Sequence, residues 1–396
     1  MAPEASVLAA HTELPHELYC DIIKNLHYLR DRPTLLRLAL VSNAWCIESQ
    51  RVLFRTVCDD SMDLDKRESV VHTHTFFLKA IIHDPARLGP YVQTYKQHEF
   101  TRHPFLAIDS KDPPAGASSY LWDLTENALR AFVNLQHLSI VPTPDYRWSP
   151  PASLLDGCTF KLKSLRWGFE SNSLRSTGPF VDFLRAQHDL LHLEVGFQPS
   201  QSDLSWLPDN FCPSLRSASC RLDCVAHVMN EHRNIAALSV GHPRQPVRQR
   251  DLAALCRLQH LSVSAAHRDL ASEWGPIDLN VILLELTSWD SATARSLPGL
   301  PKLRVLALVR EGSSHPYDAM FQMQLTLKGF RQCPNLEYVV IEDTPRVKGQ
   351  RRYKKLSIAG YNPESDDIPD IQSEEFPVEH EPGKRWWNVY LQYEIM

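Results

Sequence analysis

Four residues of the types that bind zinc lie within 13 residues of one another: Cys220, Cys224, His227 and His232. Zinc sites use cysteine and histidine at short spacings. The spacing C-x3-C-x2-H, however, matches no zinc finger, and Cys220 falls on an apolar position of a repeat described below. We therefore predict no metal site here, and a zinc protein or enzyme built on residues 215–240 is the weaker alternative.

Other signatures of catalysis are missing from the sequence. It contains no G-x-S-x-G, H-E-x-x-H, P-loop or dinucleotide-binding glycine pattern. His72 and His74 form an H-x-H pair in a segment with helical periodicity, where residues i and i+2 point to different faces and would not share a metal. We predict no catalytic residue and no cofactor, although the 18 histidines leave a scattered Ser/His/Asp set open.

The bulk composition is that of a protein with a sizeable core. The chain has 396 residues, 43% of them hydrophobic and 22% charged, and a net charge of −5. This length predicts two or three domains, or one domain with an elongated array. The negative charge argues against nucleic-acid binding. The sequence contains no run of 18 apolar residues, so we expect no membrane span. Its first 15 residues lack the pattern of a signal peptide.

The nine cysteines are odd in number and dispersed along the chain. A disulfide framework needs an even number at regular spacings in a short secreted chain. We therefore expect reduced, mostly buried thiols and a cytoplasmic or nuclear location.

Residues 14–57 have the apolar spacing of three short helices. Leu18, Ile22 and Leu26 recur at intervals of four, Pro33 opens a second helical stretch, and Ser42 or Asn43 can cap a third. Three helices in so few residues form little core, and this segment has more apolar residues than one small core can bury. The segment is either a helical cap on the next domain or a unit that docks on a partner.

This stretch resembles the F-box motif over roughly a ninth of the chain. The matching positions are Leu14, Pro15, Glu17, Leu18, Ile22, Leu36, Leu38, Val41, Ser42, Trp45, Leu53 and Phe54, with a slightly long polar loop at 27–32. The resemblance implies binding to a Skp-family adaptor and, through it, to a cullin–RING ubiquitin ligase. It implies these adaptor-facing residues: Leu14, Pro15, Leu18, Ile22, Leu36, Val41 and Trp45.

A repeated pattern dominates residues 129–345. The pattern Φ-x-x-Φ-x-Φ, with Φ mostly apolar, occurs nine times, beginning at Leu135, Leu162, Leu190, Leu215, Ile235, Leu258, Val281, Leu303 and Leu336. The mean interval of about 25 residues lies in the range of leucine-rich repeats. The asparagine or cysteine that usually follows the last Φ is absent. The array therefore resembles irregular leucine-rich repeats, a solenoid with a parallel concave sheet, which often follow an F-box.

The residues between the Φ positions should point out of the concave sheet. They are polar and small in the first six units and apolar in the last three. We predict a protein substrate there, with these contact residues: His137, Ser139, Arg166, His192, Glu194, His260, Glu285 and Tyr338. The apolar residues of the last three units have two equally favoured interpretations: they anchor the substrate, or the C-terminal tail covers them.

The segments on either side of the array differ from it. Residues 59–128 form a helical or irregular bridge by their pattern, with a helix expected over 69–83, and 88–92 is a candidate start of a degenerate first repeat. Residues 346–355 are basic and 364–381 carry eight acids without a Lys or Arg, so we expect charged loops that pair with each other. Trp387, Val389, Leu391, Tyr393 and Ile395 alternate with mostly polar residues and predict a capping strand.

Together these features predict an α/β chain in four parts: an F-box at 12–58, the bridge, the solenoid at 129–345 and a charged loop with a capping strand at 346–396. The function that this order suggests is substrate recognition for an SCF-type ubiquitin ligase, without catalytic residues in the chain. A scaffold protein that binds without directing ubiquitination is the main alternative.

Overall fold

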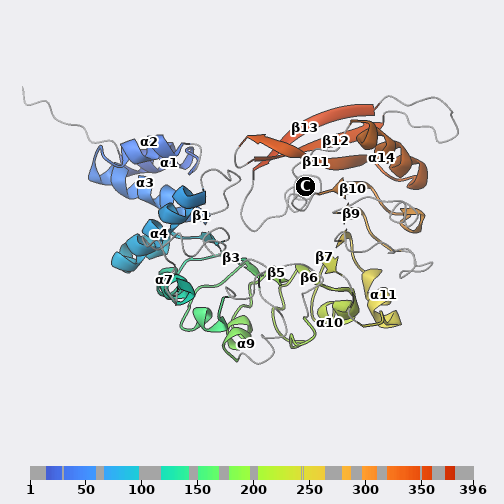
Figure 1. The fold of residues 1–396 in the computed structure, drawn as a ribbon, viewed down its shortest axis with the longest axis horizontal. Coiled ribbons are helices and arrows are strands. Elements are labelled where there is room, and N and C mark those ends of the chain that lie inside the picture. The colour runs from blue at the N-terminus through green and yellow to red at the C-terminus, as the bar shows by residue number, and fades with distance from the viewer. Residues whose placement is uncertain are drawn as a thin grey trace, which may run out of the picture.

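The computed structural model describes most of the chain between residues 15 and 379. The described residues are 15–28, 31–58, 67–97, 117–141, 150–168, 178–196, 204–241, 243, 245–263, 279–286, 297–309, 319–347, 350–358 and 371–379. Within them, thirteen strands form one sheet in which each strand pairs with its neighbours in sequence. The strands line the inside of an open arc and the helices cover its outside (Figure 1).

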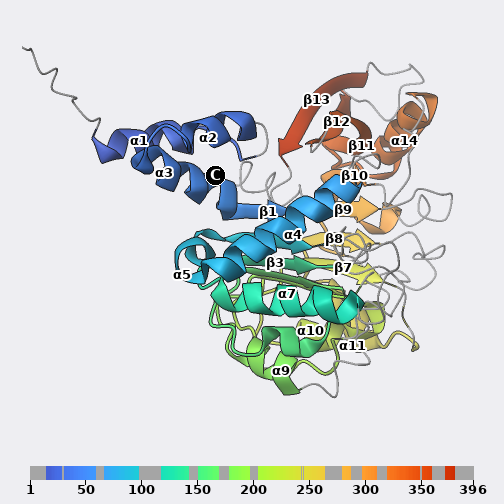
Figure 2. The same ribbon diagram turned by 60° about the vertical axis from the view of Figure 1, so that its left-hand side comes forward.

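Three helices precede the sheet: α1 (His16–Lys24), α2 (Arg32–Leu38) and α3 (Asn43–Arg55). Ser42 caps α3, since its Oγ accepts a hydrogen bond from the backbone N–H of Trp45 at 3.4 Å. This confirms one of the two predicted caps. Helix α3 leads directly into the first strand, β1 (Thr56–Cys58), so the helical unit lies at one end of the arc (Figures 1 and 2).

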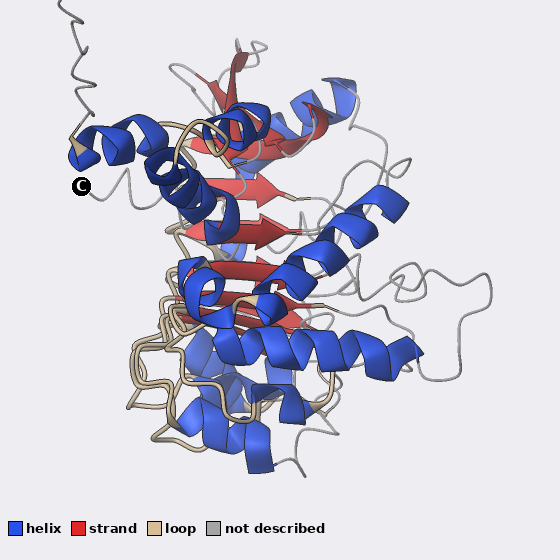
Figure 3. Ribbon diagram, turned by 90° about the vertical axis from the view of Figure 1, so that its left-hand side faces the viewer, coloured by secondary structure: helices blue, strands red, loops and turns tan. Residues whose placement is uncertain are grey.

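All nine predicted repeat units contain a strand. These are β3 (His137–Ile140), β4 (Ser164–Trp167), β5 (His192–Val195), β6 (Ser217–Arg221), β7 (Ala237–Gly241), β8 (His260–Val263), β9 (Leu283–Leu286), β10 (Val305–Leu308) and β11 (Tyr338–Val347). Strands β1 to β11 are parallel, and Figure 3 shows them stacked side by side. The side chains at the Φ positions form one continuous buried core between strands and helices. Stacking therefore supplies the core that a single unit lacks.

Helices and short 3-10 turns return the chain between strands on the outer, convex side (Figure 2). The α-helices are α4 (Arg67–His83), α5 (Pro85–Leu88), α7 (Ala117–Ala131), α9 (Gly178–Arg185), α10 (Val225–Val228), α11 (Gln249–Leu255) and α14 (Ala319–Gln332). The 3-10 turns are η2 (Gly89–Tyr91), η5 (Ala152–Leu155), η7 (Leu222–Cys224) and η8 (Leu297–Gly299). Helix α4 confirms the helix expected over 69–83.

The first repeat begins later than the sequence suggested. Residues 88–92 are the end of α5, the turn η2 and Val92, and the strand is β2 (Thr94–Gln97). Val92, Tyr95 and Gln97 occupy the three Φ positions and are fully buried. The polar Gln97 concealed this unit from an apolar pattern. Its Oε1 is satisfied inside the core by the hydroxyls of Tyr95 and Thr125, which donate to it.

One backbone contact recurs in every step of the array from β2 to β11. The carbonyl one residue after the first Φ accepts hydrogen bonds from two consecutive N–H groups of the next unit. The accepting residues are Gln93, Gln136, Lys163, Leu191, Arg216, Ala236, Gln259, Ile282 and Arg304. The units therefore share one local conformation, although their intervals and sequences vary.

Side chains just before the first Φ form a second link between units. Asn134, Asn280 and Asn335 each donate from Nδ2 to a backbone carbonyl of the preceding unit at 2.6–2.8 Å. Arg257 does the same from Nη1 at 3.0 Å. These bonds connect units that lack the asparagine ladder after the last Φ, and they satisfy carbonyls in the turns between units.

The charged C-terminal blocks are strands where the sequence predicted loops. Strand β12 (Gln350–Ile358) pairs antiparallel with β11, and β13 (Ile371–Glu379) pairs antiparallel with β12. The predicted pairing of the two blocks is confirmed, because Lys354 lies opposite Glu375, with an Nζ–Oε1 distance of 3.9 Å. Leu356 and Ile358 are buried on either side of Ser357, an alternation that favours a strand, and Tyr353 is buried on the opposite face. The predicted strand 387–395 lies outside the described residues.

Candidate interaction surfaces

The helical unit presents apolar side chains to solvent. Leu18 and Ile22 on α1 are 44% and 46% exposed, Leu36 on α2 is 50% exposed, and Leu40 and Val41 in the turn after α2 are 87% and 65% exposed. Ile47 on α3 is also exposed. Soluble proteins rarely gather so many exposed large apolar residues in one small unit unless the surface binds something.

The interior of this unit uses different apolar residues. Ile23 and Leu35 are buried, and the ring of Tyr19 meets that of Trp45 edge to face at 4.8 Å between centroids. Trp45 is thus half-buried and holds α1 against α3. In α1 and α2, adjacent residues take up the interior and the exposed surface. Ile22 and Leu36 are exposed, whereas their sequence neighbours Ile23 and Leu35 are buried.

Five of the seven predicted adaptor-facing residues are exposed: Pro15, Leu18, Ile22, Leu36 and Val41. Trp45 is half-buried, and Leu14 lies outside the described residues. Leu40 and Ile47 were not predicted but belong to the exposed apolar set. The only signal for Leu40 was an apolar surplus in the run from Leu35 to Val41.

The junction with the array is made by α3 and β1 and combines polar contacts with apolar packing, since the ring of Phe54 lies 5.4 Å from that of Phe77 between centroids. The guanidinium Nε of Arg55 donates to Gln93 Oε1 at 3.0 Å, and Arg87 Nη1 donates to Gln50 Oε1 at 2.5 Å. The guanidinium of Arg51 lies over the ring of Tyr91, 5.8 Å from its centroid. These contacts attach α3 to the first repeat and leave the exposed residues of α1 and α2 available.

Polar side chains of the concave face interact across adjacent strands. Arg166 on β4 and Glu194 on β5 form an ion pair with an Nε–Oε1 distance of 3.2 Å. His192 Nδ1 lies 2.6 Å from the Oγ of Ser217, and Ser262 donates to Glu285 Oε1 at 2.8 Å. His137, Arg166, His192 and Glu194 are half-buried and reachable, whereas Ser139, His260 and Glu285 are buried.

An apolar cluster occupies the concave face of the last strands. Its members are Ala237, Leu283, Val305, Ala307, Tyr338, Val340 and Tyr353. Tyr338, a predicted substrate residue, is buried here with the Nζ of Lys355 4.4 Å from its ring centroid. Burial also lowers the pKa of nearby His260 to about 4, so its imidazole stays neutral. We call this set the concave apolar cluster.

The candidate zinc ligands do not converge. Cys220 and Cys224 are buried in the core, and burial raises the pKa of the Cys220 thiol well above its usual range. His227 instead places its Nε2 2.7 Å from the carbonyl of Leu207, and His232 is exposed. Within the described ranges, no group of three His, Cys, Asp or Glu side chains is arranged to hold a metal ion.

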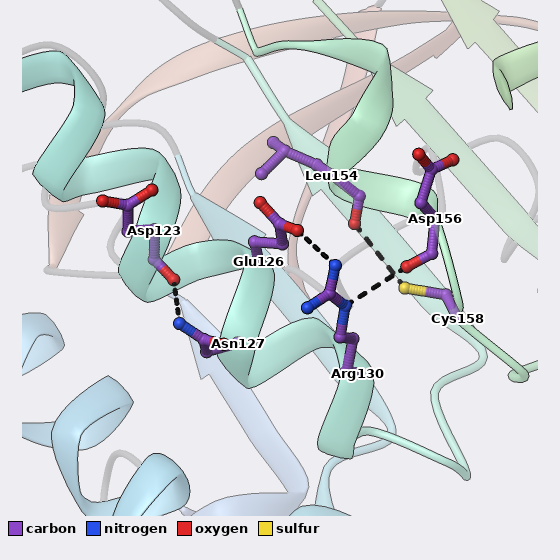
Figure 4. A network of polar contacts seen from close by, with 7 residues as sticks. All are labelled: Asp123, Glu126, Asn127, Arg130, Leu154, Asp156 and Cys158. Atoms are coloured by element: carbon purple, nitrogen blue, oxygen red, sulfur yellow. Dashed lines mark hydrogen bonds and ion pairs between the residues drawn. The ribbon is translucent and has the colours of Figure 1, made fainter.

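A hollow of about 380 Å³ lies on the convex side between η5 and α9, lined by Asp156, Cys158, Asp182 and Phe183 among others. Figure 4 shows the polar contacts beside this hollow. Arg130 of α7 pairs with Glu126 and donates a hydrogen bond to the backbone carbonyl of Asp156. The Cys158 thiol donates to the backbone carbonyl of Leu154. Burial raises the Cys158 pKa to about 12, so this sulfur is no thiolate at neutral pH.

Neither a protein-family model nor a curated protein matches the sequence. The fold itself is α/β, with a thirteen-stranded, mostly parallel sheet that alternates with helices, an arrangement consistent with a leucine-rich-repeat-like solenoid. Within the part of the chain that the structure describes, no helix is both long and apolar enough to cross a membrane.

Proposed function

We propose that this protein is the substrate-recognition subunit of an SCF-type cullin–RING ubiquitin ligase. Residues 12–58 would act as an F-box that docks on a Skp-family adaptor, and the repeat array would hold a protein substrate. The observation that carries the proposal is the set of exposed apolar side chains on α1, α2 and the turn after α2, which coincides with most adaptor-facing positions of the F-box resemblance.

The energetic argument concerns why these side chains remain exposed. Burial of a leucine or isoleucine side chain contributes about 1.5–3 kcal/mol, so leaving several in water forgoes a large stabilisation. The unit nevertheless has a packed interior around Ile23, Leu35 and Trp45. A partner that covers Ile22, Leu36 and Val41 would recover the missing burial, and such apolar anchors contribute most of the affinity in many interfaces.

The substrate would meet the N-terminal half of the concave face. There the side chains of His137, Arg166, His192 and Glu194 are at least partly accessible and carry hydrogen-bonding groups. An array with this surface selects a partner through charge and hydrogen bonds, and the mechanism requires no chemistry from the array. It holds the target near the ubiquitin-loaded enzyme of the ligase.

A pull-down with a purified Skp-family adaptor tests the docking step. The double variant Ile22→Glu with Leu36→Glu should lose binding by more than about a hundredfold, because two charges would be buried in an apolar interface. Thr34→Glu is the matched control: it adds a charge at an exposed position of α2 that faces a different side from Leu36. Circular dichroism should show all variants folded, since the replaced residues are already exposed.

Failure of the wild-type chain to bind, or equal binding by the double variant, would refute the docking claim. Adaptor binding without a ligase role remains the alternative of a scaffold protein. Deletion of residues 1–57 separates the two: a substrate receptor loses turnover of its array-bound target on deletion, whereas a scaffold leaves that turnover unchanged.

A further inference from the structure

Helix α2 carries a cation in the middle of the exposed apolar surface. Arg37 is exposed, and so are Leu36 beside it and Leu40 and Val41 in the turn that follows. The winding of α2 continues into that turn, because the N–H of Leu40 donates to the carbonyl of Arg37 at 3.1 Å. The N–H of Val41 donates in the same way to the carbonyl of Leu38 at 3.0 Å. Leu40 therefore lies over Arg37, as side chains three residues apart do in such a turn.

Arg37 points away from the interior of the helical unit. Helix α2 packs on α3, and Leu35 is its buried residue. Two residues further along a helix the side chain has turned by about 200°, so Arg37 lies on nearly the opposite side of α2 from Leu35. Figures 1 and 2 show α2 on the side of the helical unit away from β1. The guanidinium is therefore presented to a partner of the helical unit and not to the repeat array.

The chain supplies no anion for this cation. On α1, Lys24 pairs with Asp21 at an Nζ–Oδ1 distance of 3.2 Å. Within the described residues, by contrast, the Arg37 side chain forms no hydrogen bond or ion pair. The same is true of Arg32, but Arg32 is the first residue of α2 and has only Leu36 one turn further along. Arg37 is thus the cation of α2 that has exposed apolar neighbours on both sides.

A partner that covers Leu36, Leu40 and Val41 also removes water from Arg37. A charge that is buried without a counter-charge opposes binding, because its lost hydration is not replaced. The planar guanidinium offers five N–H donors in a fixed geometry that matches the two oxygens of a carboxylate. A partner with an acidic side chain at this place therefore buries the apolar surface and neutralises the cation in one contact.

We infer that the adaptor places a carboxylate against Arg37, and that this ion pair selects the partner while the surrounding apolar residues supply most of the affinity. The inference rests on the docking proposal and adds the chemistry that the partner surface must have. An apolar surface of the same shape without an acid is rejected, since it would leave the guanidinium buried and unpaired.

Calorimetric titration of the full-length chain with a purified Skp-family adaptor tests the ion pair. Arg37→Met keeps an unbranched side chain and removes the charge, so it should weaken binding at least about thirtyfold by leaving the adaptor carboxylate buried and unpaired. Without such a carboxylate, Arg37→Met should bind as tightly as the wild type or more tightly, because the interface would be apolar. Arg216→Met, which removes the same charge at an exposed position of the array, is the matched control and should bind normally.

A second measurement locates the carboxylate on the adaptor. Each acidic residue of the adaptor surface is changed singly to alanine and combined with Arg37→Met in a double-variant cycle. At one position the double variant should lose little more affinity than either single variant, a coupling of at least about tenfold. Undiminished binding by Arg37→Met, or no coupling at any position, would overturn this inference and leave the docking proposal intact. Failure of the wild-type chain to bind the adaptor would overturn both.

Discussion

The helical unit and the repeat array use the same residue types in opposite ways. In the array, the leucines at the Φ positions are almost completely buried, and Leu306 has no exposed surface. In the helical unit, Leu36, Leu40 and Val41 are at least half exposed. Both segments are rich in leucine, so composition does not distinguish them. What differs is whether a neighbouring unit of the same chain supplies the covering surface.

Because of this difference, apolar residues of the array contribute to folding stability, whereas exposed apolar residues of the helical unit are available to bind a partner. An array residue gains its burial from the next repeat, so each unit contributes to a core that extends along the arc. The helical unit has only α3 in contact with the array, and its outer apolar residues have no described element above them. Substitutions should therefore destabilise the protein in the first case and leave folding intact in the second.

The largest expected effect contrasts two leucines. Leu306→Ala should lower the free energy of unfolding by about 3 kcal/mol, because it removes buried methylene groups and leaves a cavity in the core. Leu40→Ala should change it by less than about 0.5 kcal/mol, since that side chain is 87% exposed. Urea denaturation followed by circular dichroism measures both. Equal losses would show that the helical unit buries its leucines in solution.

A smaller effect is expected within the first repeat of the array. A Cβ at Gly89 would lie 2.3 Å from the carbonyl oxygen of Ala131 at the end of α7. Gly89→Ala should therefore cost about 2 kcal/mol through overpacking. Gly178→Ala is the control, because a Cβ there meets nothing within 4 Å. A tolerated Gly89→Ala would mean that the first repeat is not packed closely against α7.

The third effect, which is spread over several pH units, is a dependence of stability on pH. Burial lowers the pKa of His74, whose Nε2 lies 2.9 Å from the Tyr95 hydroxyl, to about 3, and that of His260 to about 4. Below pH 6.5 the unfolded chain binds protons that the folded chain does not, so stability falls as pH falls. Each histidine should contribute a slope of about 1.4 kcal/mol per pH unit between pH 6.5 and its folded pKa.

His74→Gln should remove one such slope while keeping a hydrogen-bonding side chain beside Tyr95. The measurement is the urea midpoint at a series of pH values from 6.5 to 4.5. His188 is exposed and provides the control, so His188→Gln should change the slope much less. An unchanged slope in His74→Gln would indicate that water reaches this histidine, and the first repeat would then be less tightly closed than the rest of the array.

The array could be predicted from the spacing of its apolar residues, because burial of the Φ side chains requires that spacing. In every predicted unit the second and third Φ positions point into the core, and turn lengths can vary without changing that alternation. The unit at β2 escaped because Gln97 is polar, and only its hydrogen bonds to Tyr95 and Thr125 make its burial possible. The β12–β13 pair escaped for a related reason, since the blocks of charged residues obscured the strand alternation of buried Leu356 and Ile358.

The sequence by itself determined the order of the parts, the nine repeat strands and the apolar surplus of residues 14–57, because these follow from local spacing. The tertiary structure alone decided which apolar residues of that segment are interior and which are exposed. Ile22 and Ile23, or Leu35 and Leu36, are indistinguishable by type, and only the packing of α1, α2 and α3 assigns them to opposite faces. It also decided that the concave apolar residues are buried, since that requires a contact between positions far apart in the chain.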